Sequence, residues 1–155
     1  MTATDPSTPD NHVLPYRRIL IVHGFGATPE DHWFPWLADT MGADRIALPH
    51  AQAPRAADWI PLVANAIGSL TPDTAVVAHS LGCISTVQAV RRLASAGGQL
   101  GCLVAVAPFA ETLPAIGDPD LDSFIADGLD DFIDIDIKLD ASPSLRRVEV
   151  IRSDN

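Results

Sequence analysis

A serine near the middle of the chain follows a short apolar segment, in a sequence that could present its hydroxyl for nucleophilic attack. The segment TAVVAHSLGC (Thr74–Cys83) places Ser80 where a predicted strand turns sharply into a helix. Ala78 and Gly82 flank the serine at two positions where the G-x-S-x-G nucleophile elbow requires small residues, with alanine in place of the first glycine. The pattern therefore predicts that Ser80 is a nucleophile, and ordinary helix capping is the alternative role.

Two backbone amides near this serine are candidates for an oxyanion hole. The N–H of Leu81 directly follows the predicted nucleophile. An earlier segment, IVHGFGATP, offers the N–H of Phe25, and the neighbouring Gly24 and Gly26 let the backbone approach a bound carbonyl. Both segments follow predicted strands, and active sites of open α/β sheets form at the carboxyl ends of strands.

A nucleophilic serine needs a base, and no histidine occupies the expected position. In enzymes built around this elbow the triad runs serine, acid, histidine along the chain. The histidines here all precede the serine, and they are His12, His23, His32, His50 and His79. The side chain at 79 leaves the turn in a different direction from that of Ser80, which favours packing, and the histidine at 23 is predicted to order its own turn. We therefore expect the base to lie outside these 155 residues.

Short apolar runs alternate with helical patterns along the chain. The predicted strands are 17–22, 44–48, 74–78, 102–107 and 146–151. The predicted helices are 30–41, 58–70 and 81–96. This alternation predicts a three-layer α/β fold, with a mostly parallel sheet and helices on both faces.

Capping and breaking residues predict the helix ends. Thr28 is expected to cap the first helix, and Pro35 is expected to kink it or end it early. Asp58 is expected to cap the second helix, with Pro61 in its first turn, where proline is tolerated. Gly97 is expected to end the third helix.

The tryptophans and cysteines are assigned mainly to the core. Trp33, Trp36 and Trp59 have helical spacings consistent with covering the sheet, and Trp33 could also line an acyl pocket. Cys83 and Cys102 lie in apolar surroundings without metal-type spacing, which favours buried, reduced thiols.

The charge of the chain is unevenly distributed. Nine aspartates and one lysine lie between residues 118 and 140, which gives −8 of the total charge of −10. A chain with this negative charge has no basic surface that would bind nucleic acid or anionic lipid.

The acidic segment does not match a calcium site. Its stretch DPDLD starts like a calcium loop but has Ser123 and Leu129 in place of the required glycine and glutamate. We expect a solvated cap over the site that disfavours anionic substrates. The alternating segment 132–140 is expected to form a half-exposed strand or an extended stretch along the sheet edge.

Length and composition indicate one domain of ordinary globular type. Residues 1–15 are predicted to be a flexible tail and 16–155 a single domain. No apolar run is long enough to span a membrane and the start lacks signal-peptide features, so a cytoplasmic location is expected. No cofactor or metal motif is found, and the expected partner is a small acyl substrate.

Several of these motifs together resemble a known family. The segments HGFGATPEDHWFPWL, VVAHSLGC and VEVIRSDN are similar to the small single-domain serine hydrolases of the retinoblastoma-binding protein nine and YdeN type, in the α/β-hydrolase superfamily. The resemblance spans about Ile19 to Asn155. It implies a Ser-Asp-His triad, activity on small carboxylic esters, Ser80 as nucleophile, and the amides of Leu81 and Phe25 as oxyanion donors.

The acid and the histidine of that family do not map onto this sequence. The family acid follows an asparagine after the last strand, and the sequence reaches only Asn155, while Asp154 is two residues off that position. The resemblance therefore implies a C-terminally truncated chain that lacks the acid, the last helix and the histidine loop.

Two hypotheses for the function remain. The first hypothesis is a serine ester hydrolase. The second is a non-catalytic binding module on the same scaffold, and a chain ending here would be of low stability or form a homodimer.

Overall fold

The described part of the protein contains one parallel sheet. The computed structural model describes residues 14–109, 111–133 and 143–152. Within them the strands are β1 (Arg18–Val22), β2 (Asp44–Ile46), β3 (Thr74–His79), β4 (Cys102–Val106) and β5 (Val148–Ile151). They pair in the order β2-β1-β3-β4-β5, and every neighbouring pair is parallel. The predicted α/β fold is confirmed.

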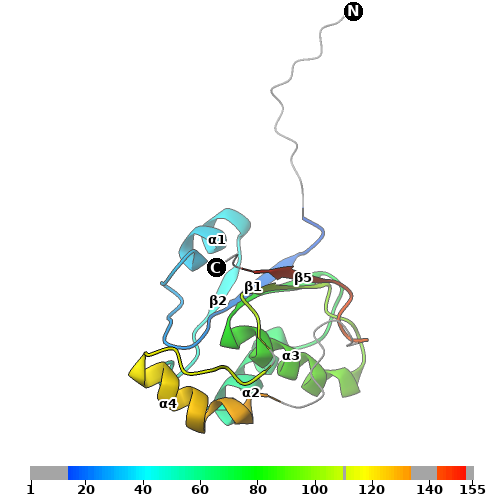
Figure 1. Ribbon diagram of the computed structural model, residues 1–155. Coiled ribbons are helices and arrows are strands. Elements are labelled where there is room, and N and C mark those ends of the chain that lie inside the picture. Colours follow the sequence, from blue (N-terminus) through cyan, green and yellow to red (C-terminus); the bar gives the residue numbers. More distant parts are fainter. Residues whose placement is uncertain (1–13, 110, 134–142, 153–155) are drawn as a thin grey trace, which may run out of the picture.

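Helices lie on both faces of this sheet. The α-helices are α1 (Phe34–Met41), α2 (Ala56–Ile67), α3 (Leu81–Leu93) and α4 (Pro119–Asp127), and short 3₁₀ turns η1 (Ala94–Ala96) and η2 (Leu129–Asp131) follow α3 and α4. Figure 1 shows α1 on one side of the sheet and α2 and α3 on the other, with α4 (yellow to orange) at the lower left. Gly97 follows η1, so the predicted end of the third helix is confirmed.

The sequence of β1 explains why both faces are covered. Its side chains are apolar at consecutive positions, as expected of a central strand in a parallel sheet. Leu20 and Val22 belong to the core beneath α2 and α3, whereas Ile21 packs with Phe34 and Ala38 of α1. A strand with apolar groups on both faces is stable only when helices cover both.

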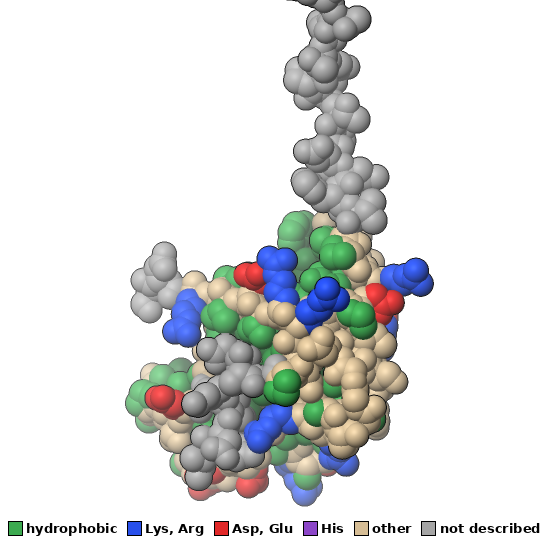
Figure 2. All heavy atoms as spheres, turned by 90° about the vertical axis from the view of Figure 1, so that its right-hand side faces the viewer, with side chains coloured by type: hydrophobic (Ala, Val, Ile, Leu, Met, Phe, Trp, Pro, Cys, Tyr) green, Lys and Arg blue, Asp and Glu red, His purple; other side chains and the backbone are tan. Residues whose placement is uncertain are grey.

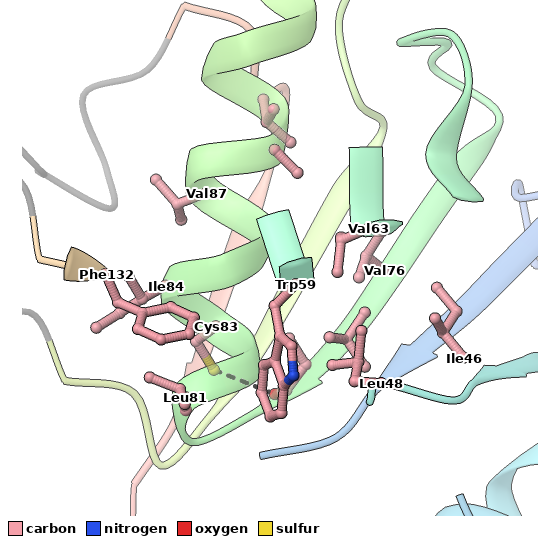
Figure 3. Close-up of a cluster of buried hydrophobic side chains, with 14 of the residues drawn as sticks. Ile46, Leu48, Trp59, Val63, Val76, Leu81, Cys83, Ile84, Val87 and Phe132 are labelled. Carbon is pink, nitrogen blue, oxygen red and sulfur yellow. Dashed lines mark hydrogen bonds between the residues drawn. The ribbon is translucent and has the colours of Figure 1, made fainter. Parts of the chain in front are cut away.

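The main core lies between the sheet and the pair α2 and α3. Trp59 of α2 is fully buried, and its indole Nε1 donates a 2.7 Å hydrogen bond to the carbonyl of Pro49. Figure 3 shows its ring near Phe132 and Cys83, and the Trp59 and Phe132 rings meet edge to face at 5.9 Å. Burial raises the pKa of the Cys83 thiol to about 12, and Cys102 is also buried and free. The predicted buried thiols are confirmed.

The first helix starts later than predicted. The Asp31 carboxylate accepts hydrogen bonds from the N–H and the hydroxyl of Thr28, which makes a turn of this segment. His32 then has a positive φ of 53°, which interrupts helical geometry. The helix begins at Phe34, so Thr28 is not its cap and Pro35 lies in its first turn without kinking it.

The second helix starts earlier than predicted. Arg55 is its N-cap, and Asp58 lies in the first turn, where its carboxylate is 3.8 Å from the Arg55 guanidinium. Pro61 is therefore inside the helix, not in its first turn. Ala56 and Trp59 are both buried against the core, and this packing extends the helix toward its N-terminus.

Two further expectations concern the surface. Trp36 is 67% exposed and does not cover the sheet, which corrects its assignment to the core. The edge strand β5 exposes Val150 and Ile151, and the homodimer stays a prediction.

Two predicted segments lie largely outside the described residues. They are residues 134–140 of the alternating segment 132–140 and residues 1–13 of the predicted tail. No helix in the described ranges is both long enough and apolar enough to cross a bilayer.

Candidate active site

The order of the strands determines where a site can form. The connection after β1 leads outward to β2, whereas the connection after β3 leads in the opposite direction to β4. In sheets of the order 2-1-3-4-5 this reversal opens a crevice at the carboxyl ends of β1 and β3, where ligands bind. The segments that follow these two strands are the turn at 23–26 and the residue Ser80.

Ser80 occupies a strained turn between β3 and α3. Its φ of 52° and ψ of −122° lie in a region that non-glycine residues rarely adopt, at a cost of about 1–3 kcal/mol. Two hydrogen bonds hold this turn. The Ser80 N–H donates a 2.9 Å bond to the carbonyl of Val106 at the end of β4, and the Ser80 carbonyl accepts a 2.9 Å bond from the N–H of Cys83 in α3. The residue is the N-cap of α3, but its side chain makes no capping hydrogen bond, which contradicts the alternative capping role.

Two glycines bring the β1 turn against this serine. A Cβ on Gly24 would lie 2.9 Å from both the carbonyl oxygen of His79 and the Cβ of Ser80. A Cβ on Gly82 would lie 2.5 Å from the carbonyl oxygen of His23 and 2.7 Å from that of Val22. The start of α3 and the end of β1 therefore approach so closely that only hydrogen fits at these positions.

The two predicted amide donors lie at this junction. Leu81 is the first residue of α3, and Phe25 is in the turn that Gly24 brings close to Ser80. Within the described residues neither amide donates a hydrogen bond to the protein, and neither does the Ser80 hydroxyl have a partner. The positive end of the α3 dipole adds to the attraction for negative charge here.

An apolar cavity adjoins the serine. Its volume is about 120 Å³. The described residues that line it are Phe25, Ser80, Leu81, Phe109, Leu113, Leu121, Phe124, Ile125 and Leu129. Three of them belong to α4, so the acidic segment does cover the predicted site, as expected of a cap. The face of α4 that lines the cavity is apolar, although the segment as a whole is acidic.

Aspartates of this segment stabilise the cap itself. The Asp118 carboxylate is the N-cap of α4 and accepts 3.1 Å hydrogen bonds from the N–H groups of Asp120 and Leu121. The Asp122 carboxylate accepts from the N–H groups of Ile116 and Gly117 at 2.7 and 2.9 Å. These carboxylates hold the loop before α4 and the first turn of the helix together.

His23 is fixed by hydrogen bonds as predicted. Its Nε2 accepts a 3.0 Å bond from the Leu48 N–H, so the proton is on Nδ1, which lies 3.0 Å from the carbonyl of Gly24. Burial lowers the pKa of this imidazole, which keeps it neutral. Both ring nitrogens are occupied, and His23 orders the turn that carries Phe25.

His79 packs away from the site. Its ring lies 5.3 Å from that of His32, 5.9 Å from Phe34 and 6.2 Å from Trp33. Burial, and to a smaller extent the positive charge of His32, lowers its pKa. Its buried Nδ1 has no hydrogen-bond partner among the described residues. The predicted packing role of His79 is confirmed.

Trp33 does not line the cavity beside the serine. It is packed against Phe34 at 4.7 Å, at the start of α1, and this corrects its possible role in an acyl pocket. The α4 residues that line the cavity were not identified from the sequence. A signal was present, because Leu121, Phe124 and Ile125 have the i, i+3, i+4 spacing of an apolar helix face among aspartates. Asp154 lies outside the described residues.

Known structures share this fold. The crystal structure of the ydeN gene product from Bacillus subtilis matches with a TM-score of 0.69 and 29% identity, covering 87% of this chain and 70% of that one. The RedJ thioesterase from the prodiginine biosynthetic pathway of Streptomyces coelicolor matches with a TM-score of 0.50 and 24% identity, covering 84% of this chain and 59% of that one. The second similarity concerns the fold alone.

Sequence comparison assigns the family. YdeN of Bacillus subtilis (strain 168), whose name provisionally describes it as a hydrolase, is 35% identical over 105 residues, which are 64% of this chain and 55% of YdeN. The chain thus spans about half the length of the curated relative it matches. The profile of the serine hydrolase family matches residues 19–128, a range that includes β1, the Ser80 turn and α4. The chain belongs to the serine hydrolase family.

Proposed function

We propose that the protein is a serine hydrolase acting on small carboxylic esters, with Ser80 as nucleophile. The main support is the strained conformation of Ser80. Its hydroxyl adjoins an apolar cavity and two amides, and none of the three groups has a hydrogen-bond partner among the described residues. Strain of this kind persists only where the surrounding structure enforces it, and it concentrates at functional sites. A small acyl compound is the partner this proposal requires, and a cytoplasmic location stays a prediction.

The proposed reaction proceeds through an acyl-enzyme. Ser80 Oγ forms a bond to the acyl carbon while its proton passes to the base, and the carbonyl electrons move to oxygen. The amides of Leu81 and Phe25 stabilise the resulting oxyanion. The oxyanion collapses, the bond to the leaving alcohol breaks, and the base returns the proton to that alcohol. Water then attacks the acyl-enzyme in the same way and releases the carboxylic acid.

We place the base and the acid of this reaction outside the described residues. The Ser80 hydroxyl donates no hydrogen bond to an imidazole anywhere in residues 14–109, 111–133 and 143–152. His23 already bonds through both ring nitrogens, and His79 packs among aromatic rings. Without a base on Ser80 we expect only residual turnover, since hydrolases without their triad keep roughly 10³–10⁴-fold catalysis over water.

Covalent labelling tests the nucleophile. A fluorophosphonate is incubated with the full-length gene product, and the modified peptide is located by mass spectrometry. We expect one adduct on Ser80, and loss of labelling in Ser80→Ala. Ser123→Ala is the matched control, because Ser123 is an exposed serine of α4. Labelling that survives in Ser80→Ala would contradict the proposal.

The second candidate is the non-catalytic binding module. It is favoured by the lack of an imidazole on Ser80 in the part of the chain that the structure describes. A binding module would bind apolar ligands in the cavity but would neither label with the fluorophosphonate nor hydrolyse any ester. The same experiment therefore separates the two candidates.

A further inference from the structure

We propose that the cavity beside Ser80 binds the acyl group, that it accepts neutral acyl groups of up to about five carbons, and that α4 sets this limit. The inference rests on the proposed hydrolase function for its chemistry, but the cavity and its walls can be tested separately. It assigns a specificity role to a helix whose sequence is chiefly notable for its charge.

The lining of the cavity selects for neutral, apolar groups. Among the described residues that line it, Ser80 carries the only polar side chain. A carboxylate placed there would lose its hydration without gaining a hydrogen-bond partner other than the reacting serine and the amides. Apolar carbon gains free energy on entering such a cavity. An aliphatic acyl chain therefore fits the cavity, and a charged one does not.

The volume limits the length of that chain. An apolar cavity of roughly 150 Å³ in a protein is large enough to bind benzene, which has six carbons. The cavity here is smaller, at about 120 Å³. By proportion it holds about five carbons. Each methylene up to that length should improve kcat/KM about fourfold, from the usual transfer free energy of a buried methylene.

The wall that α4 contributes is fixed by aromatic contacts. Phe124 of α4 stacks on Phe25 with ring centroids 5.2 Å apart, and it meets Phe132 edge to face at 5.9 Å. Phe132 is fully buried and contacts Trp59 of α2 in turn. Because α4 is joined to the turn at 23–26 on one side and to the core on the other, this wall cannot yield to a longer chain by a small side-chain adjustment.

The kinetic test is a series of p-nitrophenyl esters from acetate through propionate, butyrate, pentanoate and hexanoate to octanoate. We expect kcat/KM to rise to butyrate or pentanoate and to fall at least tenfold by octanoate. A rise that continues to octanoate, or equal values for all chain lengths, would overturn the proposal.

Variants of α4 identify the wall. Ile125→Ala removes three carbons from the lining, and the preferred acyl group should lengthen by about two carbons. Leu121→Phe adds volume at the half-buried end of the same face and should shorten the preference toward acetate. Ser123→Ala, on the exposed side of the helix, should leave the profile unchanged. If both α4 lining variants keep the parent profile, α4 does not set the limit.

A binding measurement separates the cavity from the chemistry. Ser80→Ala is labelled at its Leu and Ile methyl groups and titrated with primary alcohols from propanol to octanol, followed by NMR. Methyl shifts at Leu121, Ile125 and Leu129 that strengthen up to pentanol and weaken for octanol support the acyl pocket, even if no ester is hydrolysed and the proposed function fails. Shifts confined to other parts of the chain overturn the inference, even if esters are hydrolysed.

Discussion

At the scale of single residues, the absence of a side chain matters as much as any functional group. Gly24 and Gly82 allow the β1 turn and the start of α3 to touch, and this contact supports the strained Ser80 turn. A methyl group at either position would overlap backbone atoms, which cannot rotate away as a side chain could. The geometry of the candidate site therefore depends on backbone packing.

Gly82→Ala should destabilise the protein by about 1–3 kcal/mol, the usual cost of overpacking a filled core. Its new methyl group would lie 2.5 Å from the carbonyl oxygen of His23. The measurement is the free energy of unfolding from urea denaturation. Arg92→Ala, at an exposed position of the same helix, serves as the control and should stay within about 0.5 kcal/mol of the parent. Equal stability of the two variants would show that α3 can move away from β1 without cost.

His79 should make stability depend on pH. Burial lowers its pKa, and that of His23, below the ordinary value of 6.5. Below that pH the unfolded chain binds more protons than the folded one, so this contribution to stability is complete above pH 6.5 and is lost as the pH falls. His32 is the titratable group that faces the ring of His79.

His79→Phe keeps an aromatic ring in this cluster and removes the titrating group. The decrease in the free energy of unfolding between pH 7.5 and 5.5 should be smaller in this variant than in the parent. Urea denaturation at the two pH values measures it. An unchanged decrease would assign the pH dependence to His23 or to other groups.

At the scale of elements, α4 joins two functions on opposite faces. The inward face supplies the wall of the cavity, and the outward face carries aspartates in contact with water. Capping by Asp118 starts the helix, and stacking of Phe124 on Phe25 fixes it to the turn at 23–26. The cap and the turn are therefore expected to move as one unit.

Phe124→Ala should release that unit. Loss of a buried phenylalanine costs about 3–5 kcal/mol where the site cannot collapse. Amide hydrogen exchange should quicken in α4 and at residues 24–26, whereas β1 should keep its protection. Phe124→Leu should restore part of the protection, and Ser123→Ala should change nothing. Faster exchange limited to α4 would mean that the stack does not support the turn.

At the scale of the whole molecule, four arginines lie at the end of the sheet opposite to the α4 aspartates. Arginines lie where strands begin, with Arg17 and Arg18 at β1 and Arg146 and Arg147 before β5. Figure 2 shows Arg side chains (blue) spread over one face of the molecule. The aspartates of α4 belong to the opposite end, where the strands finish and Arg152 also lies, and they present like charge to an anion that approaches the candidate site past α4.

Neutral esters should be preferred over anionic ones for this reason. The ratio of kcat/KM for ethyl butyrate to that for monoethyl succinate, which carries a carboxylate, should fall as NaCl rises from 0.02 to 0.5 M. A variant with asparagine at exposed Asp120, Asp127, Asp130 and Asp131 should show a smaller ratio and less salt dependence. Asp118 and Asp122 are left intact because they hold the fold of α4. A ratio independent of salt would assign the discrimination to the cavity alone.

The amino-acid sequence by itself determined the features that depend on neighbours along the chain. Runs of consecutive apolar residues are sufficient to form central strands of a parallel sheet, and the segment Thr74–Gly82 already places Ser80 after a strand and before a helix. Gly97 ends a helix through its own backbone freedom. The fold class and the position of the candidate nucleophile followed from such local rules.

Only the tertiary structure decided the features that depend on contacts between distant residues. The turn between Thr28 and Asp31 and the packing of Phe34 determine where α1 begins, and the core contact of Trp59 extends α2 past Asp58. The wall of the cavity is the clearest case, because Phe25 and Phe124 are about a hundred residues apart in sequence and yet stack on each other. Side-chain packing is a property of surfaces brought together by folding, so a linear pattern can indicate which residues are apolar but not which of them will meet.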